Sequence, residues 1–324
     1  MDHTETLLDI QDLRVEFPIS IGTVRAVQGV SLTLKRGEVM GLVGESGCGK
    51  STLGFSLLRL LRPPGRIASG RILYHGRDIV AMEEKELLAV RGTGIAMIFQ
   101  DPLTSLNPLM SISEHFVETL RTHEKGISRH DALERAGGML ESLGIGTNRL
   151  HEYPHQMSGG MRQRIMIGLA LIMKPDLLVA DEPTTALDVI VEAQFLDLLQ
   201  TLRESLNLAI ILITHNLGNV AQLSDRITVM YGGTIAEVAP AQALFDEPLH
   251  PYTQGLLASI PNIRLEQPRL HTMPGSTPDL VDPPSGCIFH PRCGRAMDIC
   301  SRQRPPAFLR NGHEVSCWLY GDAP

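Results

Sequence analysis

Residues 44–51 are Gly-Glu-Ser-Gly-Cys-Gly-Lys-Ser, and these residue types at this spacing could bind phosphate. The glycines let the backbone turn so that successive N–H groups point at phosphate oxygens. Lys50 would reach the β- and γ-phosphates of a nucleotide, and the Ser51 hydroxyl would bind Mg²⁺. The residues expected to contact the nucleotide are Gly44, Ser46, Gly47, Cys48, Gly49, Lys50, Ser51 and Thr52.

A phosphate loop needs a strand before it and a helix after it, and the sequence predicts both. Residues 39–43 form an apolar run of strand length, and residues 52–61 have a helical pattern. The N-terminus of that helix would add partial positive charge beside the phosphates. The alternative, a glycine-rich turn without a ligand, does not require these flanking elements.

Three further apolar runs end in polar residues that could act on a nucleotide. Residues 177–180 predict a strand that delivers Asp181 and Glu182 at its carboxyl end, where ligands of parallel α/β sheets collect. Asp181 can bind Mg²⁺ through water, and Glu182 can accept a proton from the attacking water; alternatively, the two carboxylates cap a helix start.

Gln100 and His215 follow the other two runs, at residues 95–99 and 209–213. Gln100 could contact Mg²⁺ or water, and His215 could hold the attacking water. Taken alone, each residue is more often structural, Gln100 as a loop residue and His215 as a residue at a strand end.

The remaining patterns predict two subdomains and a hairpin. Residues 7–17 and 24–34 alternate as antiparallel strands, and Phe17 could stack on adenine or simply end a strand. Residues 111–143 predict an inserted helical subdomain. Ser158-Gly159-Gly160 opens the apolar helix 165–173, as an anion site or an ordinary cap. Residues 227–231 and 234–238, joined by two glycines, predict a β-hairpin.

Composition limits the function classes. The 324 residues are 43% hydrophobic and 20% charged, which is ordinary for a globular protein. The formal charge of −7 argues against a nucleic-acid partner. No secretory signal and no apolar run of about 18–20 residues is present. We therefore expect a cytoplasmic chain that reaches a membrane only through partners.

Four cysteines, Cys287, Cys293, Cys300 and Cys317, lie close together near the end of the chain. In a cytoplasmic protein such clustering indicates a metal site rather than disulfides. Four thiolates suit an iron–sulfur cluster or zinc, and their spacing is not that of common C-x-x-C sites. Unliganded thiols or disulfides are the remaining alternative.

Read together in this order and spacing, residues 5–240 resemble the ATP-binding subunits of ABC transporters. The motifs correspond to the Walker A loop (44–51), Q-loop (Gln100), signature (158–160), Walker B strand (177–182), D-loop (185–188) and H-switch (His215). The resemblance implies an α/β P-loop NTPase cassette at residues 1–240, with a RecA-like core, an antiparallel β subdomain and a helical subdomain at about 101–165.

The resemblance also implies ligands and roles. ATP and Mg²⁺ would be bound, with Ser51, Gln100 and Asp181 around the metal. Glu182, His215 and Gln100 would be catalytic. Ser158, Gly159, Gly160 and Asp188 would act on a nucleotide held by an opposite cassette.

Residues 101–108, 157–164 and 250–257 resemble the dipeptide and oligopeptide importer branch. That branch implies a small Cys-rich C-terminal extension, here residues 241–324, in which some members carry a 4Fe–4S cluster. Two residues depart from the wider family: Met161 replaces the more usual Gln, and Asn216 replaces the usual Asp after His215.

The implied function is ATP-driven import of peptides or related small solutes. The implied partners are a second, related cassette, two transmembrane permease subunits and, indirectly, an extracytoplasmic solute-binding protein, with the chain at the cytoplasmic face of the inner membrane. The alternatives are a non-transport ABC ATPase acting on DNA or ribosomes, an exporter cassette, and a cassette whose tail acts mainly as a redox or metal sensor.

Overall fold

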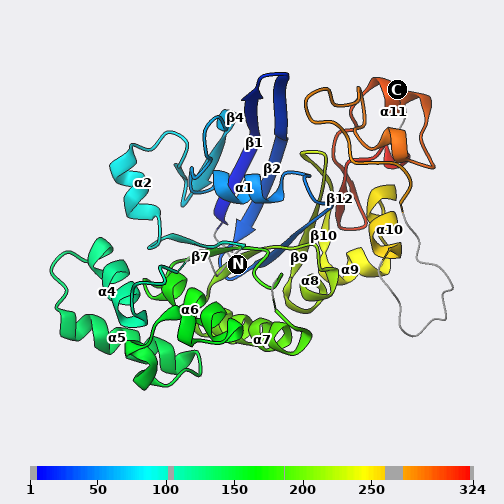
Figure 1. The fold of residues 1–324 in the computed structure, drawn as a ribbon. Coiled ribbons are helices and arrows are strands. Elements are labelled where there is room, and N and C mark those ends of the chain that lie inside the picture. The colour runs from blue at the N-terminus through cyan, green and yellow to red at the C-terminus, as the bar shows by residue number, and fades with distance from the viewer. Residues whose placement is uncertain (1–5, 101–105, 186, 260–272, 322–324) are drawn as a thin grey trace, which may run out of the picture. The chain divides into compact units, whose positions relative to one another are not determined.

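The computed structural model describes residues 6–100, 106–185, 187–259 and 273–321. The chain divides into two compact units: unit 1 consists of residues 1–81 and 212–324, and unit 2 of residues 82–211 (Figure 1). Of the segment 101–108 that resembles the peptide branch, residues 101–105 lie outside the described residues, as does residue 186 of the D-loop.

Unit 1 contains an antiparallel sheet near its N-terminal end. Strands β1 (Thr6–Ile19), β2 (Gly22–Lys35), β4 (Arg66–Tyr74) and β5 (Arg77–Asp78) lie in the order β2-β1-β4-β5. Leu8 pairs with Leu34 and Ile10 with Leu32, so apolar residues of both strands share one face. The predicted alternation of residues 7–17 and 24–34 is confirmed.

A second run of strands in unit 1 carries the phosphate loop. Strand β3 (Val39–Val43), buried throughout, runs parallel to β9 (Arg226–Tyr231). β9 and β10 (Thr234–Pro240) form the predicted hairpin, and β10 pairs with β12 (His313–Val315), which pairs with β11 (Phe308–Arg310). The C-terminal residues therefore extend the sheet that contains β3 and β9.

Short helices complete unit 1. They are α1 (Lys50–Ser56), α8 (Leu217–Leu223), α9 (Ala241–Asp246), α10 (Pro251–Ala258) and α11 (Asp298–Arg302), with 3₁₀ turns at His290–Arg292 and Trp318–Tyr320. The helix predicted over 52–61 is shorter than expected. The amides of Leu57, Leu58 and Arg59 bond three residues back instead of four, and Arg59 has a φ of 49°, which ends the helix.

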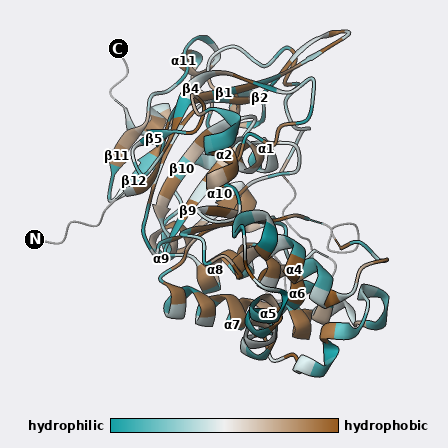
Figure 2. Ribbon diagram, turned by 90° about the vertical axis from the view of Figure 1, so that its left-hand side faces the viewer, coloured by the Kyte–Doolittle hydropathy of each residue, from teal (hydrophilic) through white to brown (hydrophobic). Residues whose placement is uncertain are grey.

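Unit 2 is mostly helical. Its helices within the described residues are α2 (Glu84–Val90), α4 (Ile112–His123), α5 (Arg129–Ser142), α6 (Gly159–Leu171) and α7 (Val189–Leu206), with 3₁₀ turns at Thr147–His151 and Pro154–Gln156. Ser111 and Ser128 cap α4 and α5, so the predicted helical stretch 111–143 is two helices. Figure 2 shows the apolar residues concentrated on α6 and α7.

Two buried parallel strands, β6 (Ile95–Ile98) and β7 (Leu177–Asp181), pair in unit 2. They are followed by β8 (Ala209–Ile213), which contains the division between the units. These strands deliver Gln100, Asp181 and Glu182 at their carboxyl ends, as the sequence predicts. Among the described residues, no helix is both long enough and apolar enough to span a membrane.

Candidate functional site

The loop 44–49 lies between β3 and α1, and two of its glycines are required by close backbone neighbours. Gly44 has a φ of 151°, and a Cβ there would lie 2.2 Å from the Met230 carbonyl oxygen; Gly49 has a φ of 101°, and its Cβ would lie 2.2 Å from the Ala26 carbonyl oxygen. The amide of Gly233 donates to the Cys48 carbonyl at 3.0 Å. The β9–β10 hairpin and β2 therefore pack directly against the backbone of this loop.

Lys50 folds back over the loop. Its Nζ donates to the carbonyl oxygens of Gly44 at 2.7 Å and Glu45 at 3.0 Å, and the side chain is buried. Ser46 and Gly47 are exposed, whereas Cys48 is buried and its pKa is raised by that burial. An ammonium held by loop carbonyls can exchange them for phosphate oxygens, which are stronger acceptors. Ser51 and Thr52 belong to the first turn of α1.

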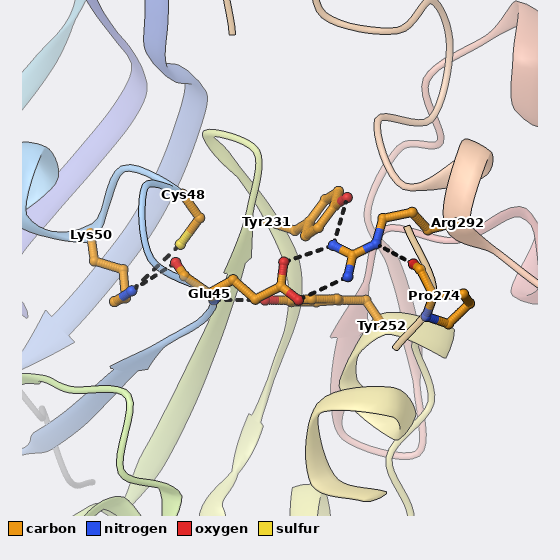
Figure 3. A network of polar contacts seen from close by, with 7 residues as sticks. All are labelled: Glu45, Cys48, Lys50, Tyr231, Tyr252, Pro274 and Arg292. Carbon is orange, nitrogen blue, oxygen red and sulfur yellow. Dashed lines mark hydrogen bonds and ion pairs between the residues drawn. The ribbon is translucent and has the colours of Figure 1, made fainter. Parts of the chain in front are cut away.

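Two residues whose roles were not predicted from the sequence, Arg292 and Tyr252, contact the other side of this loop. Glu45 receives two hydrogen bonds from Arg292, and the Glu45 amide donates to the Tyr252 hydroxyl at 2.8 Å (Figure 3). Tyr252 belongs to the segment 250–257 that resembles the peptide branch, which was the only signal pointing to it. Nothing near Arg292 in the sequence indicates a phosphate loop.

In unit 2 the structure brings two predicted catalytic residues together. Nε2 of Gln100 donates to Oε2 of Glu182 at 2.9 Å, and the Thr185 hydroxyl donates to the same oxygen at 3.1 Å. Glu182 has a φ of 46°, an uncommon conformation for a residue with a side chain. Asp181, beside it, is 2% exposed. The carboxylate of Glu182 is thus held in a fixed direction at the end of β7.

The predicted signature and D-loop residues share one hollow of about 360 Å³ in unit 2. Ser158 caps α6, its hydroxyl accepting from the Met161 amide at 3.3 Å, and Asp188 caps α7, accepting from the amides of Ile190 and Val191. A Cβ at Gly160 would lie 2.8 Å from Cγ1 of Val191. Two helix N-termini therefore open onto the same space, which favours an anionic ligand.

Gln163 is a further residue that the sequence analysis did not assign. It lies one turn into α6, is buried, and donates through Nε2 to the carbonyl of Pro183, the residue after Glu182. This contact ties the signature helix to the turn that follows the Walker B strand. The sequence around Gln163 does not predict this contact, because a Gln in an apolar helix can have many different partners.

Phe17 and His215 lie in unit 1. Phe17 lies near the end of β1, which continues to Ile19, and it pairs with Val24. Its ring packs at Gly65, where a Cβ would come within 2.4 Å of Cε1. His215 stands between β8 and α8. Asn216, the departure from the family pattern, caps α8 by accepting from the Gly218 amide at 3.0 Å. An Asp at this position could make the same cap, so the exchange preserves the local structure.

The four tail cysteines converge. The Cys287 amide donates to the Cys300 carbonyl at 2.7 Å, Cys293 follows the turn His290–Arg292, and Cys317 precedes the turn Trp318–Tyr320. Burial raises the pKa of Cys287 and Cys293, and it raises the pKa of Cys317 to about 11. The charge that Cys300 carries as a thiolate raises all three pKa values further.

The thiols are nevertheless not packed as tightly as a mononuclear metal site requires. Within the described ranges, a single group of three or more metal-ligating side chains has its ligand atoms within 4.8 Å of one another, and it consists of the exposed residues His130, Asp131 and Glu134. No three of the four tail cysteines reach that spacing.

Comparison with known families and proteins gives consistent matches over most of the chain. Residues 27–185 match the family model described as ABC transporter, and residues 236–300 match the model described as oligopeptide/dipeptide transporter, C-terminal region. The chain is 46% identical over 319 residues to the dipeptide transport ATP-binding protein DppD of Bacillus subtilis (strain 168), covering 97% of this chain and 95% of that protein.

Two further matches are with an oligopeptide transport protein and a solved cassette. Identity to the oligopeptide transport ATP-binding protein OppD of Salmonella typhimurium is 46% over 314 residues, covering 96% of this chain and 93% of that protein. A dimeric structure of a post-hydrolysis state of the ATP-binding cassette MJ0796, bound to ADP and Pi, has a TM-score of 0.65 and 25% identity, covering 72% of this chain and 98% of that chain.

Proposed function

The chain belongs to the ATP-binding subunits of ABC transporters, in the dipeptide and oligopeptide branch, and we propose that it powers import of peptides or related small solutes by hydrolysing ATP. It is an ABC-type ATPase, and its ligands are ATP and Mg²⁺. The observation that carries the proposal is the match to both family models, on a chain whose residues 44–51 fold as a phosphate loop with Lys50 turned over it.

Each nucleotide-binding role follows from residue chemistry. Lys50 exchanges its bonds to the carbonyls of Gly44 and Glu45 for bonds to the β- and γ-phosphates. The backbone amides of the loop point at phosphate oxygens, and Ser51 supplies a hydroxyl for Mg²⁺. Phe17 supplies an aromatic face for adenine.

Hydrolysis is assigned to the residues around Glu182. A water molecule must lose a proton as it attacks the γ-phosphate, and Glu182 is the base that receives it. Gln100 and Thr185 both donate to the oxygen Oε2, and these contacts fix the direction of the carboxylate. Asp181 and Gln100 serve Mg²⁺, and His215 holds the attacking water.

The signature hollow acts on a nucleotide bound by a second cassette. It is lined by Ser158, Gly159, Gly160 and Asp188, and the residues just after Asp188, Val189 and Ile190, are 80% and 71% exposed. Adjacent apolar side chains this exposed favour burial against a partner. The solved cassette MJ0796 is dimeric and carries ADP and Pi. The partner of this chain is a related cassette, here proposed to be non-identical.

The remaining partners are two permease subunits and, indirectly, an extracytoplasmic solute-binding protein. We place the chain at the cytoplasmic face of the inner membrane, where it is held by the permeases. The proposed division is a nucleotide-binding domain at residues 1–240, with a helical subdomain at about 101–165, and an extension at residues 241–324.

For the extension we propose a 4Fe–4S cluster on Cys287, Cys293, Cys300 and Cys317, in preference to zinc. Burial and neighbouring thiols raise the pKa values of Cys287, Cys293 and Cys317, so a cationic group is needed to hold these side chains as thiolates. A zinc ion with Zn–S bonds of about 2.3 Å would bring the sulfurs to within about 4 Å of one another, a spacing that no three of them reach. A 4Fe–4S cluster is larger than a single ion, and the same four thiolates would hold it at a wider spacing. When bound, the cluster supplies positive charge and ties the tail segments together.

Transport can be tested on the chain purified with its co-purifying subunits and reconstituted into vesicles. With ATP on the cassette side, uptake of labelled dipeptides and longer peptides is expected from the wild type and from Cys48→Ser, and not from Lys50→Ala. Peptide uptake that continues with Lys50→Ala, or ATP turnover without uptake of any peptide in the panel, would contradict the proposed function.

A further inference from the structure

Glu45, inside the phosphate loop, is held by the C-terminal part of the chain. Its carboxylate accepts from Nη1 of Arg292 at 2.7 Å and from Nη2 at 3.0 Å, a two-point ion pair, while its amide donates to the hydroxyl of Tyr252 (Figure 3). The Glu45 and Arg292 side chains are only 24% and 7% exposed. A paired geometry this well shielded from water is stronger than an ordinary surface salt bridge.

Arg292 is itself fixed on every side. Its Nε donates to the Pro274 carbonyl at 2.8 Å, its Nη1 also reaches the Tyr231 hydroxyl at 3.2 Å, and its guanidinium lies 5.7 Å from the centre of the Tyr231 ring. The guanidinium is therefore occupied by protein groups. Any effect of Arg292 on a bound nucleotide would therefore pass through Glu45.

The Tyr252 side chain, whose hydroxyl accepts the hydrogen bond from the Glu45 amide, is also held by its neighbours. Tyr252 is fully buried, and its ring packs against Tyr231 and Phe289 at centroid distances of 4.5 and 5.4 Å. It is the second residue of α10, which His250 caps by accepting from the Tyr252 amide. Glu45 is thus held by two buried groups, the Arg292 guanidinium and the Tyr252 hydroxyl, both contributed by the C-terminal part of the chain.

The contacts have an electrostatic consequence. A carboxylate in a phosphate loop repels the anion that the loop must bind, unless a cation neutralises it. Arg292 provides this cation, and its two-point geometry also fixes the direction of the Glu45 side chain. Since the Glu45 carbonyl is a partner of Lys50, the position of Glu45 bears on the lysine that binds phosphate.

We propose that the C-terminal extension is a positioning element for ATP binding, with Arg292 as the positioning residue that neutralises Glu45 and holds the phosphate loop in the shape that receives the nucleotide. The inference rests on the proposed nucleotide role of residues 44–51. It assigns the extension a task inside this subunit, because the residue directly before Cys293 is the one that grips the loop.

The test is ATP affinity of the full-length chain with Mg²⁺, measured by calorimetry. Arg292→Ala is expected to weaken ATP binding about tenfold, within the usual range of coupling between sites. Glu45→Gln in the Arg292→Ala background is expected to recover part of that loss, because the unpaired carboxylate no longer repels phosphate. Arg292→Lys, which keeps the charge but not the two-point geometry, is expected to fall between wild type and Arg292→Ala.

A matched control removes a comparable ion pair of unit 1 away from the loop. Arg226 bonds Glu38 at 2.8 Å, with side chains 23% and 12% exposed, and Arg226→Ala should leave ATP affinity unchanged. Wild-type affinity in Arg292→Ala, no recovery in the double variant, or an equal loss in Arg226→Ala would overturn the inference. Lys50→Ala separates the two claims: if it too binds ATP normally, the nucleotide role of the loop fails instead.

Discussion

Nε2 of Gln100 donates a 2.9 Å hydrogen bond to Oε2 of Glu182, and this bond joins two residues that lie 82 positions apart in the chain. The Thr185 hydroxyl donates to the same oxygen. The proposed base is therefore oriented by neutral donors that fix its direction without cancelling its charge. A hydrogen bond to a charged group of this kind contributes about 1.5–3 kcal/mol.

Removing Gln100 should slow hydrolysis without abolishing ATP binding. Gln100→Ala removes one donor to Oε2 of Glu182 and leaves the Thr185 donor in place, so we expect turnover at saturating ATP to fall roughly tenfold, as the loss of one such hydrogen bond predicts. Steady-state hydrolysis measured alongside ATP affinity checks this, with Thr185→Val as the matched variant. Unchanged turnover combined with lost Mg²⁺-dependent binding would show that Gln100 serves the metal alone.

A side chain at Gly160 should clash with Val191, and shortening Val191 should relieve the clash. A Cβ there would lie 2.8 Å from Val191, so Gly160→Ala should disturb the signature hollow and prevent ATP-driven pairing of cassettes. The double variant Gly160→Ala/Val191→Ala should regain part of the pairing, measured by light scattering with ATP. Equal pairing in the wild type and Gly160→Ala would show that the signature hollow is not part of the proposed interface between cassettes.

The buried His250 predicts a loss of stability in acid. Burial lowers its pKa from 6.5 to about 4, against the opposing charge of Glu237, and its Nδ1 accepts from the Tyr252 amide. Between pH 6.5 and 4 the unfolded chain takes up a proton that the folded chain does not, so stability is present above pH 6.5 and falls as pH drops through this window. The expected loss from pH 7 to pH 5 is about 2 kcal/mol.

Asparagine can make the same cap without titrating, so it isolates the effect of His250. Denaturant unfolding of His250→Asn should show a smaller fall in stability between pH 7 and pH 5 than the wild type. His130→Asn, at an exposed position of α5, is the control and should behave as wild type. An equal pH dependence in all three proteins would mean that His250 does not remain neutral in the folded chain.

The tail cysteines predict a coloured protein. After anaerobic purification the wild type should be brown, with broad visible absorption and stoichiometric iron and sulfide, because four thiolates would hold a 4Fe–4S cluster. Cys317→Ser should lose the colour, whereas Cys48→Ser, in the phosphate loop, should keep it. Colourless protein with one zinc per chain would contradict the cluster and show that the chain binds zinc instead.

Local elements could be predicted from the sequence because their signals are local. The strand 39–43, the glycine loop after it and the hairpin at Gly232 and Gly233 each occupy one continuous stretch with its own pattern. The early end of α1 could not be predicted, because Leu57 and Leu58 continue the apolar pattern while their amides turn to three-residue bonds.

Contacts between segments that are distant in the chain could not be predicted from the sequence. Glu45 and Arg292 are 247 residues apart, and neither residue type nor spacing indicates that they pair. The buried Gln163 contact with Pro183 is equally invisible, since it depends on how α6 packs against the turn after β7. Asn216, by contrast, departs from the family pattern in a way that a local contact explains, because its side chain caps α8.

The most direct test of the central claim is ATP binding and turnover by Glu182→Gln. The amide keeps the shape of the side chain but cannot accept the proton of the attacking water. We expect ATP affinity within a factor of about two of wild type and turnover reduced at least about 100-fold, the usual contribution of a general base. Turnover at the wild-type rate in this variant would contradict the account, because another group would then be the base.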